Sequence, residues 1–375
     1  MAITATPSRP RFLPHGAFHR DVQARVQAWL AEPGRKSRDL PAMHLKSAVI
    51  ITWFVASWTL LVFAANSWWS AGLLSVSLGL AVATIGSAVM HDANHGGYSH
   101  HGWVNRIMGW AIDAMGASSH IWRTKHNAAH HTWTNLDSQD DDLHVGPFAR
   151  LTVEQPLRML HRFQHFYMWI LYGFLLPKWA FFDDFVVLAN GHVKTHRIER
   201  LSRGDLAALW AGKLAFALWA VVIPLALHDG SSVLLCGLVV SFAVGVPLSV
   251  TFQLAHCVQD AGFPEVGADG RLPTDFAEHQ LATTVDFAPN NPVVTWLAGG
   301  LNYQVEHHLF PKVCHLLYPE MAVIVAQTAR DHGLRYRVTP TLTGAILSHY
   351  RMLRQLGAPV PKPAPKPVLV WAPVG

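Results

Sequence analysis

The amino-acid sequence predicts an all-α integral membrane protein. We expect four transmembrane helices in two hairpins, and a cytosolic helical cap that holds a histidine-rich di-metal site. Hydrophobic residues make up 51% of the chain and charged residues only 14%, whereas about 25% charged residues is usual in soluble domains. Four long stretches are almost free of charge. Histidine, with 24 residues, is as frequent as Asp and Glu together, and many histidines are grouped at short spacings.

The four uncharged stretches are each long enough, at about 20 residues, to cross a bilayer as a helix. They comprise residues 47–65, 70–90, 206–227 and 232–254. The links inside each pair, residues 66–69 and 228–231, are very short. Each pair is therefore expected to form a tight hairpin, which places all the long segments on one side of the membrane.

The distribution of positive charge indicates which side that is. Eight Lys and Arg residues precede Ser47, and neither short link contains any. Because Lys and Arg accumulate on the cytosolic side of membrane proteins, the termini and the large middle region are expected in the cytosol. No apolar stretch of signal-peptide length precedes Ser47, so insertion is expected to depend on the internal spans.

The other parts of the chain complete the predicted organisation. We expect an N-terminal cytosolic segment at residues 1–40, one catalytic domain at 41–356, and a Pro-rich, disordered tail at 357–375. Residues 166–179 are apolar but shorter than a span and contain Gly173 and Pro177. An interfacial or buried helix is favoured there over a fifth crossing.

Charge and cysteine content exclude several classes of protein. The formal net charge of +5 is interpreted as favouring contact with an anionic membrane surface. Nucleic acid is not expected as a partner. The three cysteines, Cys236, Cys257 and Cys314, contain no CxxC pair. Neither a disulfide framework nor a thiolate zinc site is indicated, and Cys257 and Cys314 are interpreted as small packing residues.

Histidine clusters follow the second and fourth apolar stretches and recur elsewhere. His91 and His95 stand at i and i+4, so they share one face if the helix continues. His126 and His130 repeat this spacing, and His131 adds a neighbour about 100° around an α-helix. The other candidates are His307 and His308, a pair near the end of the chain, and His256, which follows the fourth stretch as His91 follows the second.

These eight imidazoles exceed the needs of one ion, because a zinc site usually takes four ligands, or three and a water. Two ions are therefore the expected number. Imidazole suits zinc, copper, iron and nickel alike, so composition does not name the metal. Asp92, Glu306 and Asp137 are candidates for acceptors that fix the imidazole tautomers.

The histidine motifs resemble those of the membrane fatty acid desaturase family. The matching segments are HDANH at residues 91–95, HNAAHH at 126–131 and QVEHHLFP at 304–311, in the family's order and spacing. The resemblance extends over roughly residues 12–356. It implies a di-iron centre that uses O2 and two electrons to introduce a cis double bond into a long-chain acyl group.

Carried over residue by residue, the resemblance assigns iron ligands to the eight histidines. They are His91, His95, His126, His130, His131, His256, His307 and His308. Gln304 stands where many relatives have a histidine, as in front-end desaturases and a set of bacterial acyl desaturases. It is interpreted as a weak ligand or a hydrogen-bonding neighbour of the site, and Asp92 and Glu306 are considered for the same roles.

The resemblance also implies partners. The acyl group would be carried by coenzyme A, carrier protein or a membrane lipid. The sequence lacks the His-Pro-Gly-Gly motif of a fused cytochrome domain, so electrons are expected from a separate ferredoxin- or cytochrome-type donor with its reductase. The expected location is a bacterial inner membrane, with the active site on the cytosolic side.

Several other polar residues are not assigned to the site. The histidines outside the motifs are not expected to be ligands: His15, His19, His100, His101, His161, His165, His192 and His196. Residues 140–142, all Asp, are expected to be solvated or hydrogen-bonded to the motif histidines rather than to bind a cation. Lys213, inside the third stretch, is predicted to extend toward the lipid headgroups.

Two other functions remain open at this point. A fatty acyl hydroxylase or acetylenase would use the same centre, since the reactions diverge only after the first C–H cleavage. A membrane metal transporter or sensor would favour ionisable groups inside the spans, and these spans have almost none. The double-bond position, chain length, acyl carrier, electron donor and oligomeric state are not determined by the sequence.

Overall fold

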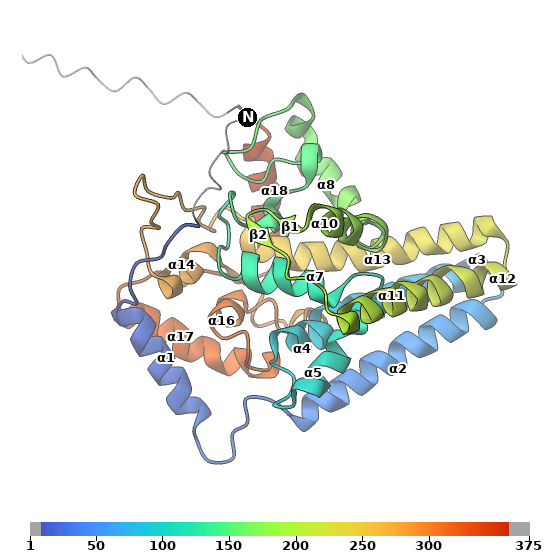
Figure 1. Cartoon of the computed structure of the whole chain (residues 1–375), viewed down its shortest axis with the longest axis horizontal. Helices are drawn as coiled ribbons and strands as arrows, with labels where there is room; N and C mark the ends of the chain where they lie inside the picture. Colours follow the sequence, from blue (N-terminus) through green and yellow to red (C-terminus); the bar gives the residue numbers. More distant parts are fainter. Residues whose placement is uncertain (1–8, 360–375) are drawn as a thin grey trace, which may run out of the picture.

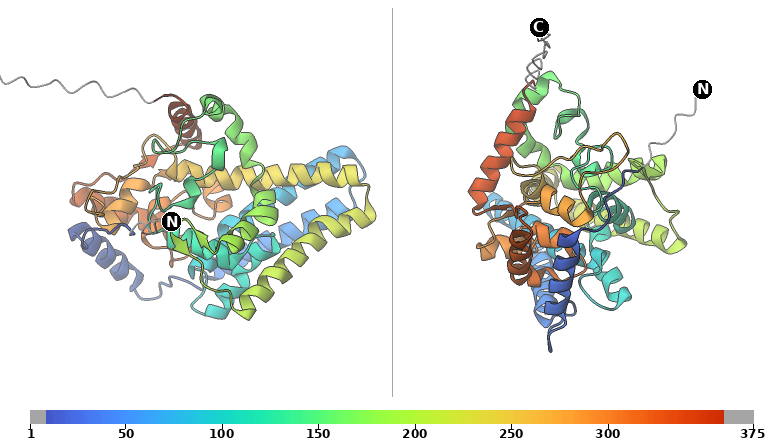
Figure 2. Two further views of the ribbon diagram at one scale, coloured as in Figure 1. Left: turned by 45° about the horizontal axis from the view of Figure 1, so that its top comes forward. Right: turned by 90° about the vertical axis from the view of Figure 1, so that its left-hand side faces the viewer.

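The computed structural model describes residues 9–359 and is built mainly from helices. It has two halves (Figure 1). Long helices project to one side, and shorter helices from the N-terminal, middle and C-terminal parts of the chain form a cap at their inner ends. Two further views show the same division (Figure 2). Residues 360–375, most of the predicted tail, lie outside the described residues.

Among residues 9–359, four helices are long and apolar enough to cross a membrane, and they coincide with the four predicted stretches. Each extends slightly beyond the stretch that predicted it at its cap end. The helices are Pro41–Phe63 (α2), Trp68–His95 (α3 Trp68–Thr84, π-helix η1 Ile85–Met90 and α4 His91–His95), Arg203–Leu227 (α11 Arg203–Ala217, π-helix η7 Leu218–Val222 and α12 Ile223–Leu227) and Gly230–His256 (α13).

Short polar connections start the second helix of each pair. Ser67 and Ser70 form a reciprocal capping box at the start of α3, and Asp229 accepts a hydrogen bond from Ser232 N at 2.9 Å at the start of α13. These side chains satisfy N–H groups that would otherwise lack acceptors at a helix end. The chain can therefore reverse within a few residues.

The four long helices are buried to very different extents. In the helix Trp68–His95, 72% of an apolar segment of 18 residues is buried, compared with 17% of the corresponding segment in Arg203–Leu227. Gly79 permits a close crossing of α3 and α13, because a Cβ at this position would lie 2.4 Å from the Cβ of Ala243. Small residues allow such backbone approach in membrane helices. The helix that carries His91 and His95 is thus central, and the third helix is peripheral.

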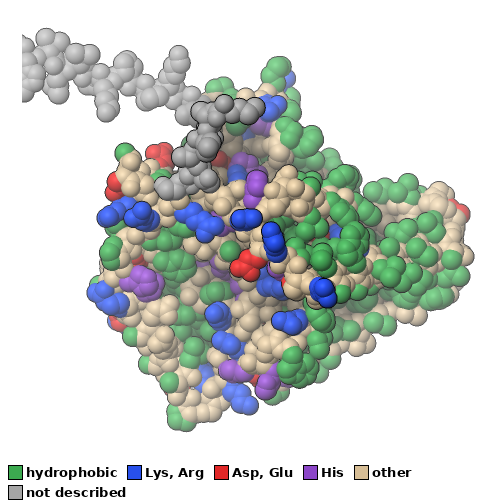
Figure 3. Space-filling view, in the orientation of Figure 1, with side chains coloured by type: hydrophobic (Ala, Val, Ile, Leu, Met, Phe, Trp, Pro, Cys, Tyr) green, Lys and Arg blue, Asp and Glu red, His purple; other side chains and the backbone are tan. Residues whose placement is uncertain are grey.

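The surface of the projecting half is apolar. Trp69 is 85% exposed and Leu73 is 72% exposed, and hydrophobic side chains cover this half in the space-filling view (Figure 3). Charged and histidine side chains gather on the cap in the same view. Such an exposed apolar surface is suited to lipid rather than to water.

Lys213 does not extend toward the headgroups, so that prediction is wrong. Its ammonium forms an ion pair with Asp184 at 2.8 Å and donates to the carbonyl of Ala180 at 2.9 Å. Asp184 begins helix α10 (Asp184–Asn190). The lysine therefore ties the third long helix to the cap.

The cap and its connections contain shorter helices. They are α1 Ala17–Leu30, α5 Gly102–Gly109, α6 Ala111–Ala114, α7 Ser119–Arg123, η2 Thr124–His130, η3 Asp141–Leu143, η4 Gly146–Phe148, η5 Met159–Phe163, α8 Gln164–Tyr172, α9 Leu175–Lys178, η6 Trp179–Asp183, α14 Phe276–Thr283, α15 Pro292–Leu297, α16 Gln304–Leu309, η8 His315–Leu317, α17 Tyr318–Asp331 and α18 Leu342–Leu356. The predicted apolar segment 166–179 forms α8, α9 and the start of η6, and within residues 9–359 it is not among the helices long enough to cross a membrane.

Two strand pairs connect parts of the cap. β1 (His192–Val193) pairs antiparallel with β2 (His196–Arg197). β3 (Asp286–Phe287) pairs parallel with β4 (Val338–Thr339). The second pair links the segment before α15 to the segment before α18. It helps to fix the C-terminal helices around the third histidine motif.

The N-terminal helix also belongs to the cap. Phe18, Val22 and Val26 of α1 are buried in one apolar cluster with Met321 and Val325 of α17. This cluster includes Val305 and Leu309 from the histidine-bearing helix α16. The first and last parts of the chain therefore support the same side of the site.

Candidate metal centre

The first histidine motif continues directly from the second long helix. The π-helix η1 leads into α4, which is formed by residues 91–95. The rings of His91 and His95 lie 4.8 Å apart between centroids, as expected for one helix face. The helix ends at Gly96, whose φ of 78° is in the left-handed region that favours glycine. Both side chains are held at the inner end of the spans.

The second motif does not lie on an α-helix, so its predicted geometry is wrong in detail. Residues 124–130 form the π-helix η2, in which backbone hydrogen bonds join residues i and i+5. His131 N donates to the carbonyl of His126 at 2.9 Å, so these two residues are one turn apart. Their Nε2 atoms are 3.2 Å apart. The intervening His130 instead points to a different group of histidines, with its ring 4.6 Å from that of His256.

The third motif and the last residue of α13 complete the site. Helix α16 carries His307 and His308 in its last turn. Their rings are nearly perpendicular, at 88°, and therefore face different neighbours. His256 ends α13 and lies 4.9 Å from the ring of His308.

All eight predicted histidines are buried and lie together. Three groups made of these histidines have mutually close ligand atoms, and we call two of them the first cluster (His91, His95, His126 and His307) and the second cluster (His130, His256 and His308). His131 lies between them, because it also groups with His307 and His308. Four separate segments of the chain thus supply one continuous set of imidazoles.

The distances between nitrogens fit metal ligands. His91 Nε2 lies 3.0 Å from His126 Nε2, and His307 Nε2 lies 2.9 Å from His131 Nε2. Two nitrogens bound side by side to one ion, each at about 2.1 Å, are separated by about 3 Å. His130 Nε2 and His308 Nε2 are buried without a hydrogen-bond partner among the described residues. Buried nitrogens without partners are costly unless an ion or proton donor satisfies them, so the residues present fit a metal centre.

The protonation of these rings also suits metal binding. Burial and the neighbouring histidines hold the pKa values of His126, His131, His307 and His308 well below the ordinary value. The rings are therefore neutral near pH 7. A histidine must be neutral at the coordinating nitrogen to bind a metal.

His130 differs because a carboxylate faces its other nitrogen. Its Nδ1 lies 3.0 Å from Asp140 Oδ2, and both side chains are buried. Burial opposes a charged ring, but the Asp140 carboxylate outweighs it and raises the pKa of His130. A carboxylate at Nδ1 fixes the ring orientation and increases the basicity of Nε2. The expectation that the acidic run 140–142 bonds to motif histidines holds for Asp140.

Other partners orient the remaining rings. His308 Nδ1 donates to Gln280 Oε1 at 2.8 Å, and His256 Nδ1 is 3.4 Å from the carbonyl of Thr283. His307 Nδ1 lies 3.2 Å from the hydroxyl of Tyr318. None of these three partners belongs to a histidine motif. Sequence reasoning missed these three partners because no local pattern marks them. Among the partners of the motif histidines, only Asp140 lies close enough to a motif in sequence to be suspected.

The three acidic residues proposed as tautomer-fixing acceptors do not contact the eight histidines in that way. Asp92 Oδ2 accepts a hydrogen bond from His315 Nδ1 at 2.8 Å. Glu306 Oε1 accepts from Tyr336 at 3.0 Å. Asp137 accepts from Gln155 at 2.7 Å. The sequence placed these carboxylates near the motifs, but the backbone turns them toward other neighbours.

Gln304 lies beside the second cluster. Its side-chain amide nitrogen is 3.0 Å from His256 Nε2, and the residue is fully buried. Its carbonyl Oε1 has no hydrogen-bond partner among the described residues. The geometry therefore places a carbonyl oxygen that accepts no hydrogen bond next to a histidine of the site.

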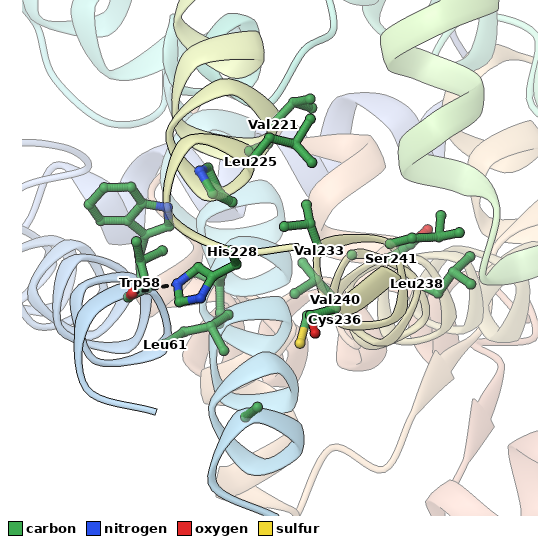
Figure 4. A pocket seen from close by; sticks show the side chains of 18 of the residues that line it. Trp58, Leu61, Val221, Leu225, His228, Val233, Cys236, Leu238, Val240 and Ser241 are labelled. Carbon is green, nitrogen blue, oxygen red and sulfur yellow. Dashed lines mark hydrogen bonds between the residues drawn. The ribbon is translucent and has the colours of Figure 1, made fainter. Parts of the chain in front are cut away.

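An apolar cavity of about 680 Å³ lies between the long helices. Figure 4 shows Trp58 and Leu61 on one wall, Val221 and Leu225 on another, and Val233 to Ser241 on a third. These walls come from α2, the third long helix and α13. His228 crosses the outer end by bonding to the carbonyl of Val62 at 2.7 Å. The cavity has room for a hydrocarbon chain.

The four apolar helices and the buried imidazole clusters define a membrane-associated protein with a histidine site suited to metal ions. A family model described as fatty acid desaturase matches residues 66–340. The chain therefore belongs to the fatty acid desaturase family. It is an enzyme, a fatty acyl desaturase.

Named relatives agree with this family. The chain is 36% identical to an sn-1 linoleoyl-lipid 6-desaturase of Arthrospira platensis, covering 94% of this chain and 96% of the relative. It is 37% identical to an enzyme of the same name from Synechocystis sp., over 94% of this chain and 99% of the relative. An acyl-lipid (8-3)-desaturase of Physcomitrium patens is 33% identical, over 91% and 72% of the two chains.

Proposed function

We propose that the protein is an oxygen-dependent acyl-lipid desaturase whose eight histidines bind two iron ions. The observation that carries this proposal is the convergence of two imidazole clusters joined by His131. The proposed ligands are His91, His95, His126, His130, His131, His256, His307 and His308. When bound, iron would supply the O2-dependent oxidising power needed to remove hydrogen from an unactivated acyl chain.

The chain's own residues would position the metal ions and restrict access to them. Asp140, Gln280 and the carbonyl of Thr283 hold the second-cluster rings with their other nitrogen directed inward. Trp122 stacks on His126 with centroids 4.3 Å apart, and Phe252 lies 6.2 Å from His91. These aromatic walls would exclude water and leave an apolar surface for an acyl chain.

The substrate we propose is an acyl chain esterified in a membrane lipid. Relatives that cover almost the whole chain are named as linoleoyl-lipid 6-desaturases. A linoleoyl chain is therefore the first substrate to test, and carbon 6 is the first position at which to look for the new double bond. Trp122 and Phe252 beside His91 support an acyl substrate; the apolar cavity at the outer ends of the helices is lined by no proposed metal ligand and does not locate the reacting chain.

We also propose the membrane arrangement. The four helices form two hairpins. Residues 1–40 precede a catalytic domain at 41–356. The protein lies in a bacterial inner membrane, and its cap faces the cytosol. Eight Lys and Arg residues before Ser47 support this orientation, as does the gathering of basic side chains on the cap (Figure 3). A separate ferredoxin- or cytochrome-type protein with its reductase would deliver electrons on that side.

The test is fatty-acid analysis of a bacterial host that expresses the wild type or His308→Ala and is fed linoleate. We expect a new triunsaturated acid, with its double bond located by mass spectrometry, only with the wild type. A hydroxy or acetylenic product would instead identify the related oxidation. An iron-loaded wild type that gives no product with a reducing partner present would contradict the acyl-desaturase proposal for this substrate.

A further inference from the structure

A second cavity, of about 310 Å³, lies beside the start of α2 rather than between the spans. Its walls include Lys46 of α2, Thr295 and Trp296 of α15, Tyr303, and His315 of η8. No proposed metal ligand lines it. The chemistry of this cavity is consequently separate from that of the histidine clusters.

A buried ammonium group is the main polar feature of the cavity. The Lys46 side chain is only 6% exposed, and its Nζ lies 2.9 Å from His315 Nε2. Because His315 Nδ1 already bonds to Asp92, Nε2 is the acceptor and Lys46 is the donor. An ammonium has three N–H groups, so this bond leaves two of them for other acceptors.

The charge of Lys46 lacks a direct counter-ion among the described residues. The ion pairs within residues 9–359 include the other lysine of the apolar helices, Lys213, with Asp184 at 2.8 Å, but none includes Lys46. The nearest carboxylate on its hydrogen-bond path, Asp92, lies behind the His315 ring. The aromatic face of Trp296 is 5.3 Å from Nζ, which favours a cation but does not neutralise it. Burial of a cation is costly unless an anion accompanies it.

The position of the cavity indicates where that anion comes from. Leu45 and Val49 of α2 are 68% and 48% exposed, and Val293 of α15 is 64% exposed. Leu45 and Val293 are adjacent in sequence to the lining residues Lys46 and Pro292. Leu45 and Val49 belong to a helix that is long enough to cross a membrane. Lysine and tryptophan are typical of the level of the lipid headgroups. With the membrane arrangement proposed above, the cavity lies at the level of the lipid phosphates.

We propose that this cavity binds the phosphate of an anionic membrane lipid, with Lys46 as its charge partner and Trp296 beside the headgroup. The oxyanion accepts the two N–H groups that His315 does not use. The lipid's acyl chains lie against the exposed apolar side chains of α2 and α15. This binding site does not depend on the desaturase reaction, and its ligand need not be the substrate.

Native mass spectrometry of the full-length protein in neutral detergent tests this proposal. The probes are phosphatidylglycerol and an uncharged galactosyl lipid with the same acyl chains. We expect the wild type to retain phosphatidylglycerol about tenfold more tightly, as one unshared ion pair at a partly dry site allows. Equal retention of the two lipids by the wild type would overturn the proposal without any variant.

Variants locate the site. Lys46→Gln should remove the preference, Lys46→Arg should keep it, and Lys36→Gln should leave it unchanged. Lys36 is an exposed cation in the segment before α2, so it controls for general attraction to anionic lipid. Loss of the preference with Lys36→Gln, or its persistence with a folded Lys46→Gln, would refute the assignment.

If Lys46→Gln does not fold, retention of the preference by Lys46→Arg together with Lys36→Gln supports the site, and its loss in Lys46→Arg opposes it. Displacement of the lipid by millimolar inorganic phosphate would show a site for free anions instead.

Discussion

The two histidine clusters are fixed in different ways. In the second cluster each ring has a partner at Nδ1: Asp140 for His130, the Thr283 carbonyl for His256, and Gln280 for His308. In the first cluster, His91 Nδ1 is buried without a hydrogen-bond partner among the described residues. His307 has the Tyr318 hydroxyl at 3.2 Å from its Nδ1, so the first cluster has fewer hydrogen-bonded rings than the second and depends more on the backbone.

The origin of the side chains explains this difference. In the first cluster, His91 and His95 share one turn of α4, and His126 and His307 come from η2 and α16. The second cluster takes one ring each from η2, α13 and α16. No two rings of the second cluster share a helical turn, so hydrogen bonds must select their rotamers. The second cluster should therefore be the more sensitive to loss of neighbouring polar groups.

The largest effect should come from removal of a ligand in either cluster. We expect both His91→Ala and His308→Ala to abolish product formation and to lower the iron content of the purified protein, because each removes a coordinating nitrogen. Fatty-acid analysis and iron measurement on folded protein check this. Full activity in either variant would exclude that histidine from the site.

Loss of the carboxylate at His130 should have the next largest effect. We expect Asp140→Asn to reduce iron affinity or activity about 10- to 100-fold, as for other acceptors behind metal-bound histidines. Asp137→Asn is the matched control, because Asp137 lies in the same acidic region but bonds to Gln155. Iron titration of both variants decides the matter, and equal losses would argue that the effect is general destabilisation.

Removal of the Tyr318 hydroxyl should have a smaller effect. Its contact with His307 Nδ1 is 3.2 Å, and the backbone of α16 already places this ring. We expect Tyr318→Phe to reduce iron affinity by less than about tenfold. A loss as large as that of Asp140→Asn would remove the proposed difference between the clusters.

The smallest effect is expected at Glu306, although it precedes two proposed ligands. Burial, together with the neighbouring Asp286, holds the pKa of Glu306 well above its ordinary value. This shift favours the neutral acid, and Glu306→Gln preserves the shape of the neutral side chain and an acceptor for Tyr336. We expect iron content and activity within about twofold of the wild type, less than one lost hydrogen bond would produce. Loss of iron in this variant would restore Glu306 as a candidate ligand.

Two acidic residues that are close in sequence show how far the site could be predicted. Asp137 and Asp140 both follow the second motif, yet only Asp140 contacts a histidine of the site. Local sequence does not distinguish them, because the choice depends on how the chain turns after His131. The same limit applies to Gln280, Thr283 and Tyr318, which approach the site only through the packing of distant helices.

The sequence by itself determined the features that depend on composition and short spacing. Four apolar helices follow from hydrophobic length, because the energy of burial in lipid adds along a continuous stretch. Most of the candidate histidines were recognisable because imidazoles at i and i+4, or adjacent in the chain, can reach one metal site. The tertiary structure alone decided the division into two clusters, the π-turn that separates His130 from His131, and the different partners of Lys46 and Lys213. These features depend on contacts between segments far apart in sequence, and no local pattern encodes such contacts.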